Sequence, residues 1–250
     1  MTEPRPNDPA RDGDLMSEVY DEWHGEHPDT EATVEFLARL AGPGPVLELG
    51  PGTGRLALPL VERGVQVHGI EASPRMAERM RAKPGGERVR IMLGDFADVG
   101  VDGAFTVVFA AFNTFTNLFT REDQVRCFAN VARHLTADGS FVIEALVPSP
   151  EMMKAGHTVN VLQVDADNVV LGASFYDRVS QQLRMVYLVF DERRVRLIPL
   201  HARFVWPAEL DLMARLAGLR LQERWEGWRR EEFTAESRNQ VSVYVPQDAR

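Results

Sequence analysis

The amino-acid sequence predicts an α/β protein with a doubly wound parallel sheet that carries helices on both faces. Three observations lead to this fold class. Between about residues 45 and 147, short apolar runs alternate with segments of helical periodicity, a pattern typical of parallel strands joined by right-handed helical crossovers. Between about 157 and 206 the runs alternate without helical periodicity, which indicates an antiparallel β-rich insertion. A helix and two further strands then complete the pattern.

The bulk composition limits the classes of partner. The chain has 250 residues, of which 44% are hydrophobic and 26% charged, enough for one core with a modest insertion. A net charge of -9 without a basic stripe disfavours nucleic acid or an anionic membrane as the main partner. Cys127 is the single cysteine, so the chain cannot form an internal disulfide. No apolar run approaches the ~18 residues of a membrane span, and we expect a cytoplasmic protein.

The elements follow in order from local signals. The first 14 residues are polar and contain three prolines, so we expect a disordered tail over 1–14. One helix begins behind the cap residue Asp29 or Thr30, and another begins at Pro74 behind the cap residue Ser73. The expected strands are 45–50, 65–71, 89–95, 105–112 and 140–146, then 158–164, 168–177, 182–190 and 194–206 in the insertion, then 219–228 and 240–246. The later expected helices are 122–135 and 208–218.

A glycine-rich turn follows the first expected strand. Gly50, Gly52 and Gly54 allow a sharp turn and let a ligand lie against the main chain. Their G-x-G-x-G spacing differs from the G-x-G-x-x-G that favours a dinucleotide. Glu48 stands between two leucines of the buried strand just before the turn, which argues against an ordinary surface charge. A carboxylate there would repel a pyrophosphate but suit a ligand that carries an ammonium and a sulfonium.

Acidic residues also end the next two strands. Glu71 is placed to accept hydrogen bonds from both hydroxyls of a ribose, or else to reinforce the cap of the next helix. Asp95 could accept from an adenine amino group while Phe96 covers a ring face; the alternative is a turn aspartate beside a core phenylalanine. The strand ends share the carboxyl edge of the sheet, where open α/β folds bind ligands.

These motifs resemble those of the class I S-adenosylmethionine-dependent methyltransferases. The resemblance rests on ELGPGTG, on IE and GDF at the next two strand ends, and on HLTADGSFVIEA around the fifth strand, and it covers roughly residues 45–147. It implies S-adenosylmethionine as cofactor and a Rossmann-like seven-stranded sheet whose last strand is antiparallel. YDEWH and the insertion are similar to small-molecule methyltransferases of secondary metabolism, most nearly the N-methyltransferases of nucleotide-linked amino sugars.

The resemblance also implies a set of site residues. Those that would bind the cofactor are Tyr20, His24, Glu48, Gly50, Gly52, Glu71, Ala72, Met76, Asp95, Phe96 and Ala111. Gly50 and Gly52 would lie under the methionine part, and Ala111 would contact it through its backbone. Tyr20 and His24 belong to a segment that closes over cofactor and substrate in the amino-sugar enzymes. Alternatively, Tyr20 pins this segment to the core and His24 is solvated.

The fourth strand ends in Phe-Asn-Thr-Phe-Thr-Asn, residues 112–117. Enzymes that methylate a flipped adenine carry an N/D-P-P-aromatic run there, so DNA methylation is disfavoured. Asn117 falls where the amino-sugar enzymes have a histidine, and an amide cannot act as a general base. The candidates for orienting a substrate are Tyr20, His24, Asn113 and Asn117, although Asn117 could also cap the next helix. The sequence assigns no catalytic base and no metal site.

The sequence therefore predicts methyl transfer to O, N or C of a small molecule. Residues 15–147 with 207–250 would form the cofactor-binding domain and 148–206 an inserted antiparallel β cap, whose free edges could pair in a homodimer. Three alternatives remain open. One is a methyltransferase-like protein that binds the cofactor without catalysis, another is an NAD-dependent oxidoreductase, and the third is a methyltransferase with a protein acceptor.

Overall fold

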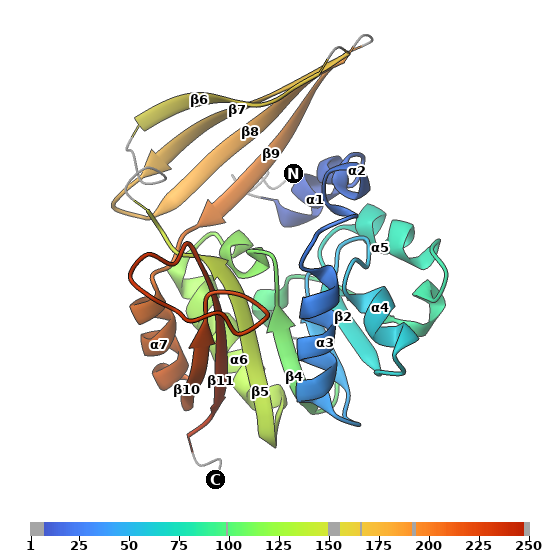
Figure 1. The fold of residues 1–250 in the computed structure, drawn as a ribbon, viewed down its shortest axis with the longest axis vertical. Helices are drawn as coiled ribbons and strands as arrows, with labels where there is room; N and C mark the ends of the chain where they lie inside the picture. Colours follow the sequence, from blue (N-terminus) through green and yellow to red (C-terminus); the bar gives the residue numbers. More distant parts are fainter. Residues whose placement is uncertain (1–7, 99, 150–155, 166, 192–193, 248–250) are drawn as a thin grey trace, which may run out of the picture.

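The computed structural model describes residues 8–98, 100–149, 156–165, 167–191 and 194–247. They form a seven-stranded sheet flanked by helices and a four-stranded sheet that stands above it, with two short helices beside the junction (Figure 1). The predicted α/β class, with an antiparallel insertion after the fifth strand, is confirmed.

The seven-stranded sheet has the order β10-β11-β5-β4-β1-β2-β3. β11 runs antiparallel to both of its neighbours, β10 and β5, and the other described pairings in this sheet are parallel. Because β1 pairs with both β2 and β4, the chain leaves β1 on one side and later returns on the other, and such a switch in strand order opens a crevice at the carboxyl ends. The strands are β1 Val46–Leu49, β2 Val67–Glu71, β3 Arg90–Leu93, β4 Phe105–Ala110, β5 Leu135–Leu146, β10 Leu219–Trp225 and β11 Asn239–Pro246.

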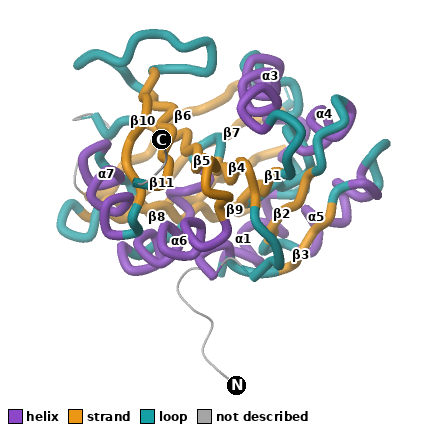
Figure 2. The backbone as a smooth tube through the Cα atoms, turned by 90° about the horizontal axis from the view of Figure 1, so that it is seen from below, coloured by secondary structure: helices purple, strands orange, loops and turns teal. Residues whose placement is uncertain are grey.

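Helices cover both faces of this sheet, with α3 and α4 on one side and α6 and α7 on the other (Figure 2). The apolar side chains accordingly form two clusters, one between each helical layer and the sheet. No helix in the described part of the chain is long and apolar enough to cross a membrane. The helices are α3 Thr30–Ala41, α4 Ala57–Glu62, α5 Pro74–Arg81, α6 Arg121–His134 and α7 Pro207–Leu216.

The four-stranded sheet is a fully antiparallel meander in the order β6-β7-β8-β9. Its inner face packs Val170, Val189 and Ile198 against Val19 of the N-terminal segment. The meander therefore holds the N-terminal helices close to the carboxyl ends of the large sheet. Its strands are β6 Gly156–Val164, β7 Asn168–Asp177, β8 Gln182–Asp191 and β9 Val195–Arg203.

The expectation of a disordered tail over 1–14 is wrong from Pro9 onward, and residues 1–7 lie outside the described residues. Helix α1 (Pro9–Met16) begins behind Asp8, whose side chain accepts from the backbone N–H of Arg11, and is followed by α2 (Tyr20–His24). The α1 helix is anchored by Asp14, which accepts hydrogen bonds from the Ser73 hydroxyl at 2.6 Å and from a backbone N–H of α5 at 3.2 Å. The polar composition of this segment does not indicate a helix, because contacts with α5 rather than local signals order α1.

Ser73→Ala should lower the free energy of unfolding by about 2 kcal/mol, because it removes two hydrogen bonds of a fully buried hydroxyl. The Ser73 hydroxyl caps α5 by accepting from Met76 N at 3.1 Å and also donates to Asp14. Thr120→Ala is the matched control, because Thr120 caps α6 without any tie to α1. Chemical denaturation measures the free energy of unfolding, and hydrogen exchange should show that the amides of α1 lose protection only in Ser73→Ala. Equal amide protection of α1 in both variants would contradict this prediction.

Candidate active site

A cavity of about 500 Å³ lies where the carboxyl ends of the strands, the N-terminal helices and the meander meet. The large sheet and its loops contribute Gly50, Gly52, Glu71, Ala72, Met76, Phe96, Phe112, Asn113, Thr114, Thr116, Asn117 and Leu146. The N-terminal segment contributes Pro9, Asp12, Gly13, Met16, Tyr20 and His24, and the meander with its exit contributes Leu183, Tyr187, Pro199, Leu200, His201, Ala202 and Phe204. A separate, more open cleft of about 640 Å³ is lined by none of the predicted site residues.

The glycine turn presents its main chain to this cavity. Gly50 and Gly52 have φ angles of +71° and +58°, in the left-handed region that favours glycine. A Cβ on Gly50 would lie 2.6 Å from Thr114 Cγ2, so the turn leaves no room for a side chain there. A ligand that lies on this turn therefore contacts backbone.

Glu71 joins the turn to β2. One carboxylate oxygen accepts from Gly52 N at 2.8 Å, and the other accepts from Ser73 N at 2.8 Å. Burial raises the pKa of Glu71, and these backbone hydrogen bonds oppose the rise. A carboxylate has about four lone-pair positions, so two remain for the hydroxyls of a ligand. Glu71 thus also supports the start of α5, as the alternative interpretation of the sequence expected.

Glu48 and Arg55 place a carboxyl group and a guanidinium near each other beside the turn. Glu48 is only 5% exposed, and its Oε2 has no hydrogen-bond partner among the described residues. Burial raises the pKa of Glu48 to about 8, and the nearby Arg55 guanidinium opposes the rise. Arg55 has a buried Nε that likewise lacks a partner in the described structure, while its Nη1 donates to Thr30 at 3.0 Å. One carboxylate oxygen and one guanidinium nitrogen therefore lack partners among the described residues, which fits a ligand that carries one ammonium and one carboxylate.

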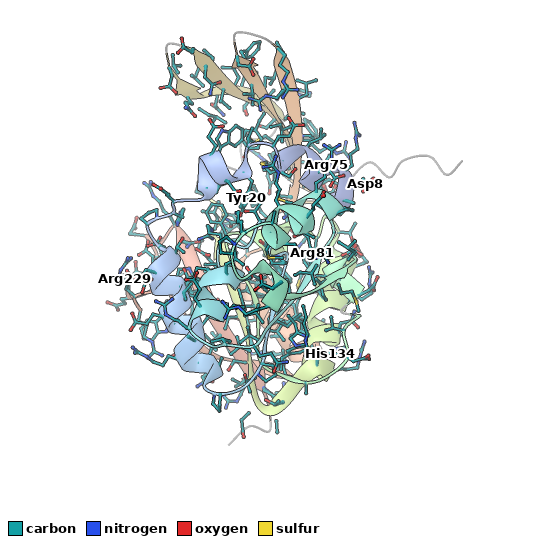
Figure 3. All side chains as sticks on the ribbon, turned by 90° about the vertical axis from the view of Figure 1, so that its right-hand side faces the viewer. Asp8, Tyr20, Arg75, Arg81, His134 and Arg229 are labelled. Atoms are coloured by element: carbon teal, nitrogen blue, oxygen red, sulfur yellow. The ribbon has the colours of Figure 1, made fainter. Side chains whose placement is uncertain are left out.

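Tyr20 extends from α2 toward the glycine turn (Figure 3), and a Cβ on Gly52 would lie 3.9 Å from its ring. Burial raises the pKa of the Tyr20 phenol, so the phenol stays protonated. His24 stacks edge-to-face on Tyr20 and on Phe112, each at 5.1 Å between ring centroids. It is half-buried rather than solvated, and burial followed by the charge of Arg55 lowers the pKa of its imidazole.

Helix α2 is fastened to the turn from outside the cavity. The Asp21 carboxylate accepts from Thr53 Oγ1 at 2.5 Å and from Lys83 Nζ at 2.8 Å. These hydrogen bonds keep the pKa of Asp21 below its ordinary value, although burial opposes them. The helix that carries Tyr20 is therefore held over the same turn that forms the cavity floor.

The remaining predicted residues divide into two groups. Ala72, Met76 and Phe96 line the cavity as an apolar wall. Asp95 and Ala111 do not line it. Asp95 is exposed and accepts from Ala97 N at 2.9 Å, which is the turn-aspartate alternative, while Ala111 is buried in the core. Glu48 lies behind the cavity lining as well. The cofactor roles of all these residues stay predictions.

Asn113 and Asn117 both line the cavity. Asn113 adopts a left-handed φ of +63°, and its side-chain oxygen accepts from Leu146 N at 2.6 Å, so it ties the loop after β4 to the end of β5. The idea that Asn117 caps the next helix is wrong, because α6 is capped by Thr120, which accepts from Asp123 N at 3.1 Å. The amide of Asn117 is therefore not used as a helix cap.

Sequence reasoning missed several residues at this site. Arg55 directly follows the glycine motif, but its type alone does not show that it turns back toward Glu48. Asp12 and His201 line the same cavity although 189 positions separate them, and nothing local in the sequence could have paired them. No group of three or more potential metal ligands occurs in the part of the chain that the structure describes.

Comparisons with known proteins agree with this geometry. Residues 46–139 match the family model of a methyltransferase domain. The cypemycin N-terminal methyltransferase of a Streptomyces species is 30% identical over 201 residues, which cover 79% of this chain and 81% of the relative. The CcbJ methyltransferase structure from Streptomyces caelestis superposes with a TM-score of 0.91 at 40% identity and covers 96% of this chain and 99% of its own.

A more distant structure, an amino pentose methyltransferase from Micromonospora echinaspora with S-adenosylmethionine bound, shares the fold with a TM-score of 0.65 at 23% identity over 91% of this chain and 95% of its own. The chain belongs to the class I S-adenosylmethionine-dependent methyltransferases. It is an enzyme of that class, with S-adenosylmethionine as its cofactor. This excludes the NAD-dependent oxidoreductase.

Proposed function

We propose that this enzyme transfers the methyl group of S-adenosylmethionine to an amine nitrogen of a small-molecule acceptor. The observation that carries the proposal is the partly enclosed cavity, which the N-terminal helices and the meander line above the strand ends. An acceptor, or the reactive end of one, must fit within it. An amine is supported by the relative named for methylating an N-terminus, which is itself an amino group.

The floor of the cavity fits the cofactor. Gly50 and Gly52 would lie under its amino-acid part, and Glu48 and Arg55 would complement its ammonium and its carboxylate. Glu71 would accept from the ribose hydroxyls with the lone pairs that its backbone hydrogen bonds leave free. When bound, the cofactor supplies a methyl group on a positively charged sulfur, which leaves as a neutral thioether.

The opposite side of the cavity fits the acceptor. Leu183, Tyr187, Leu200 and Phe204 form a largely apolar wall, with a few polar side chains among them to set the orientation. Methyl transfer is a direct displacement, so the protein mainly aligns the nucleophile with the methyl carbon, and such alignment is worth effective molarities of about 10⁵ to 10⁸ M. The N-terminal helices and the meander exclude water during this step.

The proposal is tested by incubating the enzyme with cofactor labelled in its methyl group and with paired acceptors that differ only in carrying an amine or a hydroxyl. We expect label in the amines. Mass spectrometry of the products and of the protein fraction assigns the methylated atom. Label confined to hydroxyl acceptors, to carbon, or to protein would contradict the proposal.

The outer face of the meander supports a homodimer. The strand register places three apolar rows across this face: Val159-Ala173-Val186-Pro199, Val161-Leu171-Leu188-Leu197 and Val164-Val169-Phe190-Val195. The outer-strand residues Val159, Val161, Val164, Val195 and Leu197 are each more than half exposed. Exposed apolar patches of this kind mark interaction sites. Two such sheet faces can pack on one another, so the proposed partner is a second copy of this chain.

Replacing Val161 and Leu197 together with lysine should break this dimer, because it buries a charge at each end of the middle apolar row. Light scattering coupled to gel filtration should show twice the 28.1 kDa chain mass for the wild type and the single mass for the variant. Leu216→Lys is the matched control, since Leu216 is 77% exposed on α7, away from this face. A wild-type protein with the mass of one chain would contradict the dimer.

A further inference from the structure

A histidine and a carboxylate meet in the acceptor half of the cavity. His201 on β9 and Asp12 on α1 are joined by a 2.6 Å contact between Nδ1 and Oδ2. Each side chain is 17% exposed, and both line the cavity. The ring of Phe119 packs edge-to-face on the imidazole at 5.4 Å between centroids and limits its rotation. Geometry of this kind orients a proton-transfer group.

The carboxylate selects one form of the imidazole. An ionised carboxylate only accepts hydrogen bonds, so Nδ1 of His201 carries the hydrogen that Asp12 accepts. Nε2 is then the nitrogen with the free lone pair, and it has no hydrogen-bond partner among the described residues. The charged residue opposite His201 on the neighbouring strand is Arg184, which pairs with it across β8 and β9. When the imidazole is protonated, the Asp12 carboxylate offsets the repulsion between the imidazolium and the Arg184 guanidinium.

Other titratable groups at the cavity are less suited to accept a proton. Burial raises the pKa of the Tyr20 and Tyr187 phenols, which therefore remain protonated. Both carboxylate oxygens of Glu71 already accept backbone hydrogen bonds. His24 has no carboxylate partner among the described residues, and burial followed by the Arg55 charge disfavours its protonated form. His201 is the cavity imidazole whose protonated form has a carboxylate beside it.

We propose that His201 is the general base that removes the proton from the acceptor amine, with Asp12 as its positioning residue. This rests on the proposed function, methyl transfer to an amine. An ammonium acceptor gives its proton to Nε2, and the freed lone pair then forms the N–CH₃ bond while the S–CH₃ bond breaks with its electron pair remaining on sulfur. The proton later passes from the partly exposed imidazolium to solvent.

His201→Asn tests the base separately from the contact with α1. The asparagine amide N–H can take the place of Nδ1–H against Asp12, but the variant has no base. We expect kcat/KM for an amine acceptor near neutral pH to fall by about 10² to 10⁴-fold, with the affinity for S-adenosylhomocysteine changed by less than about twofold. We also expect the deficit to shrink as pH rises and the amine loses its proton in solution.

Two further variants complete the test. Asp12→Asn should retain the contact but lose the charge, so its kcat/KM should fall between those of wild type and His201→Asn. His24→Gln, whatever its turnover, should keep the wild-type acidic limb of the pH profile, whereas in His201→Asn the rise should move to the higher pH at which the free amine forms. Wild-type kcat/KM and a wild-type pH profile in His201→Asn, or a shifted profile only in His24→Gln, would overturn the proposal. Absence of amine methylation by the wild type would instead refute the proposed function.

Discussion

Gly52→Val should abolish cofactor binding while the protein remains folded. The φ of Gly52 is +58°, where a β-branched residue is strained, and its backbone N–H donates to Glu71 at 2.8 Å. The valine methyls would also project toward the Tyr20 ring, into the space where we expect the cofactor to lie. Calorimetric titration with S-adenosylhomocysteine should show an affinity loss of about 100-fold or more, which corresponds to about 2.7 kcal/mol.

Gly42→Val separates the strain from the ligand effect. Gly42 has a similar φ of +56°, and a Cβ there would meet nothing within 4 Å. It ends α3 and does not line the cavity. We expect Gly42→Val to lower the thermal midpoint by an amount comparable to Gly52→Val and to bind S-adenosylhomocysteine normally. Wild-type affinity in Gly52→Val would mean that the cofactor does not lie on this turn.

Glu48→Gln should remove a pH dependence from cofactor binding. Glu48 in the free protein has its pKa raised to about 8, because the carboxyl is buried. A bound ammonium favours the ionised carboxylate, so binding below about pH 8 must release a proton. Wild-type affinity for S-adenosylhomocysteine should therefore fall by up to tenfold for each pH unit from 8 to 6. The glutamine variant should bind more weakly at pH 8, and its affinity should change less with pH.

Glu48 should also make the stability of the ligand-free protein depend on pH, but stability should fall as pH rises, whereas cofactor affinity should increase. Its folded pKa of about 8 lies above the ordinary 4.5 of an unfolded chain, so the folded state holds more protons between these values. The stabilising contribution of protonated Glu48 is complete below about pH 4.5 and is lost as pH rises toward 8. The ligand-free wild type should therefore lose stability relative to Glu48→Gln between pH 6 and 8. If the thermal midpoints of the wild type and of Glu48→Gln changed in parallel between pH 6 and 8, Glu48 would not be a buried, protonated group.

Much of the fold and the cavity floor could be predicted because the signals are local. Apolar runs, cap residues and the glycine spacing lie within single strand-turn-helix units. The carboxyl ends of parallel strands necessarily meet at one edge of a sheet, which brings Gly52 and Glu71 into contact. The fold class is confirmed for this reason, and the antiparallel insertion is confirmed because its alternating runs are long and regular.

The rest of the site depends on contacts between distant segments. Helix α1 is polar and shows no apolar periodicity, so its order follows from hydrogen bonds to α5 that the local sequence does not reveal. The pairing of Asp12 with His201 requires α1 and β9 to meet at one cavity. Asp95 shows the converse case, because its position at a strand end predicts a ligand contact while its side chain is exposed and bonded within its own turn.

A crystal structure with bound S-adenosylhomocysteine tests most directly whether the cofactor binds at the glycine turn and the acceptor binds beside the meander. We expect the amino-acid end of the ligand between Glu48 and Arg55, its ribose on Glu71, and its sulfur facing the half of the cavity that holds His201. A ligand lying instead against Leu183 and Tyr187, with the glycine turn uncontacted, would contradict both the cofactor site and the acceptor site.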